Sequence, residues 1–509
     1  MRNRSRVFWL LVGVTALGAV LRFATLGAQS YHHDEIVTAS RVLRVGFGHA
    51  MDAVGFSESA PPLYYALAWL WTQVAGTGEW GLRSLSAVAG VATIPVAFFI
   101  GRELRGQRAG LLAAALVAVN PMLLWYSQEA RAYSLLCLFC ALSLLYCVRA
   151  MDPERGAKHD RRDFVAWGVF SALAMATHYF AVFPLIAEVV LLWRRRGRAM
   201  LPGLWIVGLT AALLAPLAYH QMSYGHAEWI GKFSLGHRLG EVAISFMVGE
   251  IGDIIGRVES PEPALIPLAL VLAAFVLLAM RGTREDRRAA AIPLAVGATA
   301  IFVPLLLAVG PGGKDFVLSR NLLPALVPLL CAAAVALAVK RAPRAGGAIA
   351  TLLLVYSLGF CIWASASPDL QKPDWKAVAA RLGEPNAPRA TVTWVIGLAP
   401  LRYYLEDGAT QSKPSEGAIQ LKPSEGYDWL VREVNFVSLG QAPPPPGRVL
   451  GPRFRESGYE KVGELYIRRF ETTGQELVPL RLRTLRYAKT NFRNNGVLLD
   501  GVGPGVGPG

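Results

Sequence analysis

The sequence predicts an α-helical protein that crosses a membrane many times, with a small α/β domain toward its C-terminal end. Of its 509 residues 53% are hydrophobic and only 17% are charged, whereas a soluble globular protein carries roughly 25% charged residues. Apolar runs of about 20 residues, the length needed to cross a bilayer, recur along the chain. Clusters of Lys and Arg separate these runs in alternate loops. A soluble or disordered chain is therefore excluded.

The apolar runs give the predicted membrane spans. They cover residues 7–26, 82–101, 109–126, 132–150, 201–219, 263–280, 289–309, 321–339 and 346–365. The apolar stretch 164–193 is interrupted by His178 and Pro184, and we interpret it as a hairpin of two short spans. The total is about eleven crossings. The apolar stretch 63–74 is short and lacks basic flanks, so we expect an interfacial helix there.

The basic residues predict the orientation in the membrane. Arg2, Arg4 and Arg6 precede the first span, which predicts a cytoplasmic N-terminus by the positive-inside rule. This first span lacks a small-residue cleavage site, so we expect it to be retained. Every second loop is basic only if 164–193 crosses twice, and the C-terminal domain is then extracytoplasmic. Much of the net charge of +15 is thus a topological signal in a plasma- or inner-membrane protein, with no nucleic-acid partner.

The chain divides into three predicted parts. Residues 1–365 form the membrane domain, whose first outer loop is 27–81. Residues 366–490 form an outer α/β domain, in which composition and periodicity predict helices at 374–382 and 401–405 and strands at 390–397 and 462–470. No residue of this domain stands out as a candidate for chemistry. The ending 491–509 is rich in Gly and Pro, and we expect it to be disordered.

Asp34 and Glu35 form the first candidate site. These adjacent carboxylates follow the first span, and like charges near a low-dielectric region are unfavourable. One interpretation is a general base whose neighbour orients an acceptor or a metal. The other is N-terminal capping of a helix that begins near Ile36, where acidic side chains are favoured. The two interpretations are compatible, and the sequence does not separate them.

Histidines and a buried glutamate have competing interpretations. We interpret His32 and His33 as interfacial side chains, because adjacent histidines rarely bind one ion; His33 and Glu35 are the candidates if a divalent metal is bound. His178, at the tip of the hairpin, caps a helix end or lines an aqueous cavity. Glu188 lies inside an apolar run, and we expect it to extend toward the cytoplasmic arginines that begin at Arg194.

Charged residues at two predicted outer helix ends form the second candidate site. Glu129, Arg131 and Tyr133 open one helix, either as a surface ion pair or as contacts for an anion or sugar. Lys314 and Arg320 are outer cations, against the positive-inside trend. Because a guanidinium binds phosphate through two parallel hydrogen bonds, this pattern favours contact with a lipid phosphate. Contact with ordinary bilayer headgroups is the alternative.

Short motifs, each weak alone, become informative through their order. They are His33-Asp34-Glu35, Ala60-Pro61-Pro62-Leu63-Tyr64-Tyr65, Leu82-Arg83-Ser84-Leu85-Ser86, Asn120-Pro121, Tyr126-Ser127-Gln128-Glu129-Ala130-Arg131-Ala132-Tyr133, Ser319-Arg320-Asn321-Leu322-Leu323-Pro324 and Pro373-Asp374-Trp375. Together they resemble the membrane glycosyltransferases of the C-type (GT-C) fold, above all family 39, with the protein O-mannosyltransferases and aminoarabinose transferases. The resemblance is dense over 20–195 and sparse to about residue 380.

The resemblance implies an inverting transferase that takes a sugar from a polyprenyl-phosphate donor on the outer face of the membrane. Asp34 would match the family's base, and Glu35 its orienting neighbour. Arg131 and Arg320 would bind the departing phosphate, with Glu129, Tyr133, His178 and Lys314 as further donor or substrate contacts. Two departures are His178, where many relatives carry Lys, and Asn321, where they carry Tyr. Some relatives need a divalent metal and others do not.

Other functions remain compatible with the sequence. A transporter is one, although no internal repeat between halves is evident. An assembly protein of the cell envelope without transferase activity is another, and a ligase that moves whole oligosaccharides is a third. The sugar and the acceptor, whether lipid, glycan or protein, are left open. No nucleotide-binding motif or serine-nucleophile motif is present in the sequence.

Overall fold

The computed structural model forms two compact units. It describes residues 2–43, 46–57, 59–155, 157–224, 230–250, 262–310, 315–367, 370–405, 428–439, 450, 452–474, 476–481 and 495–500. The first unit contains Met1–Gly27 and Val45–Ala366, and the second contains Ala28–Arg44 and Ser367–Gly509. The segment that carries the acidic motif thus belongs to the same unit as the C-terminal part of the chain.

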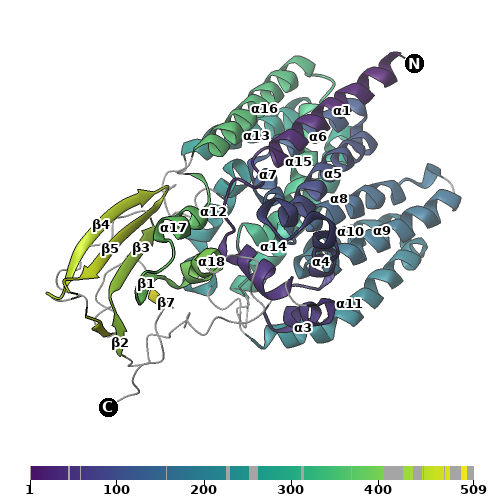
Figure 1. The fold of residues 1–509 in the computed structure, drawn as a ribbon. Helices are drawn as coiled ribbons and strands as arrows, with labels where there is room; N and C mark the ends of the chain where they lie inside the picture. Colours follow the sequence, from purple (N-terminus) through teal and green to yellow (C-terminus); the bar gives the residue numbers. More distant parts are fainter. Residues whose placement is uncertain are drawn as a thin grey trace. The chain divides into compact units, whose positions relative to one another are not determined.

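The first unit is a helical bundle (Figure 1). Its helices are α1 (Arg2–Phe23), α3 (Phe47–Ser57), α4 (Leu63–Ala75), α5 (Glu79–Arg105), α6 (Gln107–Val119), α7 (Pro121–Ser127), α8 (Tyr133–Ala150), α9 (Ala157–Thr177), α10 (Val182–Arg196), α11 (Leu201–Met222), α12 (Leu235–Val248), α13 (Glu262–Arg281), α14 (Arg284–Val309), α15 (Leu326–Leu337) and α16 (Pro343–Ala366), with short 3-10 turns η3 (Tyr179–Ala181) and η6 (Arg320–Ala325). The stretch 164–193 is divided between α9 and α10, with His178 and η3 between them. That the two helices cross the membrane as a hairpin stays a prediction.

The described residues contain eight helical stretches long and apolar enough to span a membrane. The number is nine if α6 and α7, which meet at a 58° bend, form one broken span. The total of about eleven crossings stays a prediction. Asn120 explains the bend, because its side chain accepts from Leu123 N at 3.0 Å and caps α7, whose first residue is Pro121.

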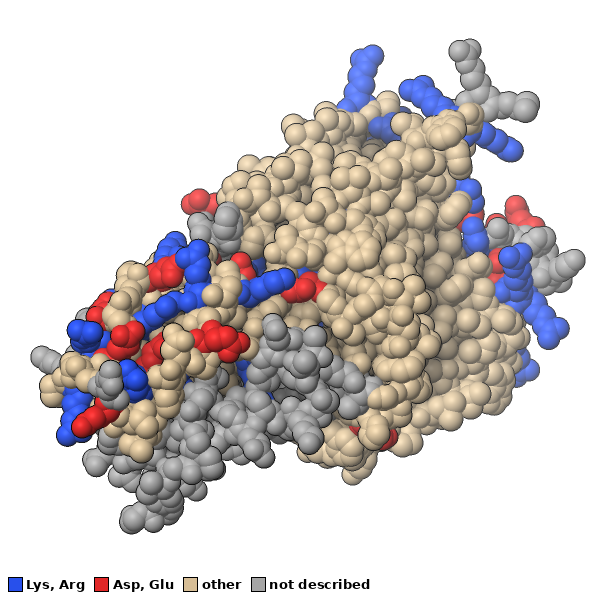
Figure 2. All heavy atoms as spheres, viewed as in Figure 1, with Lys and Arg blue, Asp and Glu red and all other residues tan. Residues whose placement is uncertain are grey.

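The surface of the first unit is that of a lipid-exposed bundle. Large apolar side chains point outward, among them Trp205, Leu213 and Met280, each more than 70% exposed. Figure 2 shows a broad uncharged middle, with Lys and Arg gathered at the end where the N-terminus lies. Such a surface would be unstable in water and suits a bilayer.

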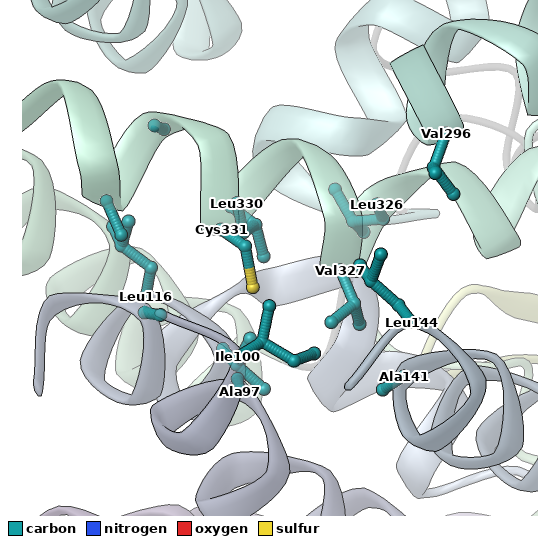
Figure 3. Close-up of a cluster of buried hydrophobic side chains, with 14 of the residues drawn as sticks. Ala97, Ile100, Leu116, Ala141, Leu144, Val296, Leu326, Val327, Leu330 and Cys331 are labelled. Atoms are coloured by element: carbon teal, nitrogen blue, oxygen red, sulfur yellow. The ribbon is translucent and has the colours of Figure 1, made fainter. Parts of the chain in front are cut away.

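Helix α15 forms the centre of the bundle. It packs against α5, α6, α8 and α14, and Val327, Cys331 and Val335 on it are almost inaccessible. Ile100 of α5, Leu116 of α6 and Leu144 of α8 surround it (Figure 3). Arg320 is the first residue of η6, which leads directly into α15. The central helix therefore fixes the position of the Arg320 backbone.

The structure contradicts the expectation that Glu188 extends toward the cytoplasmic side. It does not extend to the arginines that follow Arg194 but is buried, and it accepts from Ser143 Oγ at 2.5 Å and from Trp167 Nε1 at 2.7 Å. These donors come from α8 and α9, while Glu188 lies on α10. In an apolar interior, donors on neighbouring helices satisfy a carboxylate without the extension that a distant charge requires.

The second unit contains a five-stranded sheet (Figure 1). The order is β4 (Phe454–Val462), β5 (Leu465–Thr472), β3 (Glu433–Leu439), β1 (Arg389–Trp394) and β7 (Asn495–Asp500), with only β1 and β3 parallel. A separate pair joins β2 (Asp428–Val431) to β6 (Val478–Arg481). Helices α17 (Trp375–Leu382) and α18 (Val395–Leu405) pack on one another and share a core with Val437 and Ile467 of the sheet.

Three predicted elements of this unit need correction. The strand expected at 390–397 ends at Trp394, where α18 begins. The strand expected at 462–470 is two strands joined through Gly463, which has a positive φ of 56°. Residues 495–500, expected to be disordered, form β7 along β1, with Leu498 buried. The Gly- and Pro-rich composition around them hid a short apolar strand.

Candidate functional site

The acidic motif opens a short helix in the second unit. Helix α2 (His33–Ile36) continues into one π-helical stretch, η1 (Val37–Val42). Glu35 Oε2 accepts from the backbone N–H of His32 at 3.0 Å, which caps the helix start. The capping interpretation therefore holds for Glu35, although the helix begins three residues before Ile36. Asp34, the residue before Glu35, is half-buried.

A lysine from the C-terminal part of the chain meets this carboxylate. Lys372 Nζ donates to Glu35 Oε2 at 3.1 Å, and both side chains are buried. A buried carboxylate needs a compensating positive charge and hydrogen bonds, and Glu35 has both. The two adjacent acids are thus in different environments: Glu35 is held by protein partners, and Asp34 keeps contact with solvent.

The neighbouring histidines are placed by backbone contacts. Burial lowers the pKa of His32 to about 4, against the opposing charge of Asp34, so His32 is neutral at neutral pH. His33 Nδ1 lies 3.1 Å from the carbonyl oxygen of Ile396 on α18. Among the described residues no three His, Cys, Asp or Glu side chains gather as metal ligands. With the ammonium of Lys372 against Glu35, the pair of His33 and Glu35 does not fit a divalent cation.

The second candidate site lies in the first unit, around His178. His178 is buried at the turn before η3, where its Nδ1 accepts from Phe180 N at 3.3 Å. This confirms the histidine as a helix-end cap. Burial lowers its pKa to about 3, and the positive charges of Arg131 and Arg320 lower it further. His178 is therefore a neutral ring beside two cations, and it does not supply the charge that a lysine would.

Aromatic rings connect the elements of this site. Tyr126 and Tyr133 meet edge to face at 4.7 Å between ring centroids, and Tyr133 lies 5.7 Å from His178. His178 in turn lies 4.8 Å from Phe180, which lies 5.6 Å from Phe316. The rings thus join α7, α8 and η3 to the segment that precedes Arg320. Glu129 and Tyr133 are buried, so the group that opens α8 is not a surface ion pair.

Helix α12 holds the segment before Arg320. Arg238 donates to both carboxylate oxygens of Asp315, and its Nη1 donates to Val317 O at 2.8 Å. Beyond the end of α12, buried Glu250 accepts from Ser319 Oγ at 2.5 Å. Sequence reasoning did not identify Arg238, although a basic residue in an apolar outer segment was a usable signal. Lys314 lies outside the described residues.

Arg22 holds the turn that carries Arg131. This residue of α1 is fully buried, and its guanidinium donates to Ser127 Oγ at 3.1 Å and to the carbonyl oxygens of Val117 and Ala118. Gln128 Nε2 donates to Leu21 O and Arg22 O, each at 3.2 Å. Sequence reasoning missed Arg22 because the run 7–26 was judged by its average hydropathy, although an arginine inside a span is itself a signal.

Known proteins match both the sequence and the fold. Residues 59–220 match the family model of the dolichyl-phosphate-mannose-protein mannosyltransferases. This segment runs from before α4 into α11 and includes Arg131 and His178. No curated protein sequence gives a significant match.

Solved structures share the architecture along nearly the whole chain. ArnT from Cupriavidus metallidurans in the apo state is 14% identical, with a TM-score of 0.55 over 91% of this chain and 98% of ArnT. The same protein bound to undecaprenyl phosphate gives 14% identity and a TM-score of 0.51 over 90% and 97%. An oligosaccharyltransferase of Archaeoglobus fulgidus has a lower TM-score of 0.46, at 13% identity over 74% of this chain and 57% of that one.

The expected fold class is confirmed. The helical bundle with its small C-terminal sheet has the GT-C fold. The family match includes residues 59–195 of the region where the motif resemblance is dense, and Asp34 and Glu35 lie before it. Residues 59–220 are thus similar to the dolichyl-phosphate-mannose-protein mannosyltransferases, and the chain shares the fold of ArnT.

Proposed function

We propose that the protein transfers a sugar from a polyprenyl-phosphate donor to an acceptor hydroxyl, with inversion, on the extracytoplasmic face of the plasma or inner membrane. The observation that carries the proposal is the convergence of Arg131 and Arg320 on one neutral, buried histidine. Two guanidinium groups beside an aromatic cluster suit an anionic headgroup with an apolar tail. The ArnT structure that shares the fold holds undecaprenyl phosphate, which supports a lipid phosphate as that anion.

Asp34 is the proposed general base. It is half-buried beside Glu35, whose charge is compensated by Lys372, and beside His32, whose neutral form is favoured. Asp34 takes the proton of the acceptor hydroxyl while the hydroxyl oxygen bonds to the anomeric carbon of the sugar. Attack from the face opposite the phosphate inverts that carbon. One positioned base contributes roughly 10²–10⁴-fold to such a step.

Arg131 and Arg320 are the proposed phosphate ligands. As the bond between the anomeric carbon and the phosphate oxygen breaks, negative charge grows on the leaving polyprenyl phosphate. Guanidinium groups placed beforehand stabilise that charge without reorganisation. Glu129 and Tyr133 lie next to Arg131 in the sequence and would contact the donor. His178 would serve as a neutral hydrogen-bonding group. Lys314 is a further proposed donor contact from the sequence alone.

The decisive experiment measures polyprenyl phosphate release by the purified protein in lipid vesicles supplied with polyprenyl-phosphate sugars and acceptor lipids, glycans or peptides. We expect Asp34→Asn to lower kcat by roughly 10²–10⁴-fold with little change in the KM for the donor. Arg320→Met should raise that KM, because it removes a phosphate ligand. Asp52→Asn is the matched control, since Asp52 is an exposed carboxylate on α3.

The contradicting outcomes are distinct. Loss of activity in Asp52→Asn equal to that in Asp34→Asn would remove the assignment of Asp34 as the base. No release by the wild type with any donor and acceptor, together with solute uptake into the vesicles, would replace the transferase with a transporter.

A further inference from the structure

The acidic segment contacts the C-terminal part of its unit at two successive positions, Ser30 and Tyr31. Ser30 Oγ donates to Pro373 O at 2.8 Å and accepts from Trp375 N at 3.0 Å. The backbone N–H of Tyr31 donates to Tyr404 Oη at 2.7 Å. These contacts come from the start of α17 and the end of α18, so both helices hold the chain just before Asp34.

The contact of Lys372 with Glu35 is the charged member of this set. Its side chain is 3% exposed and that of Glu35 is 0% exposed. A carboxylate or ammonium without an opposite charge is strongly disfavoured in such a place, so the pairing stabilises both side chains. The same oxygen of Glu35 also caps α2 through His32 N. Lys372 therefore holds the side chain that fixes the first turn of the helix, and Asp34 lies in that turn.

We propose that Lys372 is a positioning residue for the transfer reaction. Through Lys372, the C-terminal domain helps to orient Asp34, the proposed general base. This inference rests on the proposed function. The ammonium fixes Glu35, Glu35 fixes the start of α2, and the carboxylate of Asp34 is thereby aimed at the acceptor hydroxyl. Lys372 also compensates the charge of Glu35, which reduces the repulsion between the two adjacent acids.

The first test is a split between kinetic constants in the vesicle assay. We expect Lys372→Met to lower kcat about a hundredfold, because a displacement near 1 Å at a reacting group has about that effect. The KM for the donor should stay within about threefold, since the proposed phosphate ligands are untouched. Lys372→Arg keeps the positive charge, so its kcat should be at least tenfold higher than that of Lys372→Met. Lys461→Met is the matched control, an exposed lysine on β4 of the same unit, near the ring of Tyr466.

A second test does not depend on transferase activity. In a double-mutant cycle of thermal unfolding, Glu35→Gln and Lys372→Met should each lower the midpoint, and together they should lower it by less than the sum. If the wild type is inactive with every donor, the proposed function fails and this cycle still judges the ion pair. Additive shifts would overturn the inference. So would an active wild type in which Lys372→Met and Lys461→Met behave alike, or a Lys372→Met loss that appears only in the KM for the donor.

Discussion

At the scale of single residues, Gly90 shows how the site tolerates a buried cation. A methyl group at Gly90 would lie 2.1 Å from Ser127 Oγ and 2.9 Å from Arg22 Nε. Helix α5 therefore needs a residue without a side chain where Arg22 reaches Ser127. The hydrogen bonds of Arg22 in turn fix the end of α7, which precedes the turn with Glu129 and Arg131.

We expect Gly90→Ala to destabilise the protein. Overpacking of a filled interior typically reduces stability by about 1–3 kcal/mol, and here it also displaces a hydrogen bond of a buried cation. The measurement is the thermal unfolding midpoint in detergent, with polyprenyl phosphate release as a second readout. Gly13→Ala is the control, because Gly13 lies in α1 with no atom within 4 Å of an added methyl group. Equal midpoints for the two variants would refute the role given to Gly90.

At the scale of elements, α12 supports the irregular segment before η6. The outer segment 220–262 matched no readable motif, yet it contains a helix whose Arg238 binds Asp315 and the backbone of Val317. Ser234 caps this helix by accepting from His237 N at 3.3 Å. Arg320 follows Val317 by only three residues. The hydrogen bonds of Arg238 therefore help to determine where the Arg320 guanidinium lies.

We expect Arg238→Gln to weaken donor binding. Hydrogen bonds to charged groups contribute about 1.5–3 kcal/mol each, and loss of even one that orders the Arg320 segment corresponds to roughly a tenfold rise in the KM for the donor. The check is steady-state kinetics in vesicles, with kcat expected to change less than KM. His237→Gln is the control, since exposed His237 contacts Glu241 on its own helix. A fall in kcat alone would contradict the assignment.

At the scale of the whole molecule, the distribution of charge predicts which side of the membrane each part faces. The helical unit has an uncharged middle, whereas the second unit shows both signs of charge on the face in Figure 2. The orientation with a cytoplasmic N-terminus and an extracytoplasmic C-terminal domain remains a prediction from the positive-inside rule. The proposed function depends on it, because donor and acceptor must meet Asp34 on the outer side.

Single cysteines test this orientation in intact cells. A membrane-impermeant maleimide should label Glu384→Cys in the C-terminal domain and should leave Arg195→Cys, near the end of α10, unlabelled until the cells are opened. Both positions are exposed, and the native cysteines Cys137, Cys140, Cys147, Cys331 and Cys361 are all buried, which keeps the background low. The reverse labelling pattern would place Asp34 in the cytoplasm and remove the proposed function.

The local properties of the chain were readable from the sequence. Hydropathy determined the helical bundle, periodicity located the helix that became α17, and motif order indicated the GT-C fold before any packing was known. These features depend on residues close together in the sequence. A membrane span requires only a run of apolar residues, and a helix cap requires only a few suitable residues at the helix end. Local composition did not predict elements that depend on pairing with a distant part of the chain. One example is β7, which is stabilised by its pairing with β1.

The tertiary structure alone decided the partners of the charged residues. Three pairs that are far apart in the sequence are hydrogen-bonded in the structure. They are Glu35 with Lys372, Arg22 with Ser127, and Arg238 with Asp315. A sequence determines that a buried charge needs compensation, but only the fold determines which distant residue supplies it. For this protein, the sequence determined the membrane class, the fold and the acidic motif. The structure decided that the C-terminal domain holds that motif, because the energy of a buried ion pair depends on proximity in space.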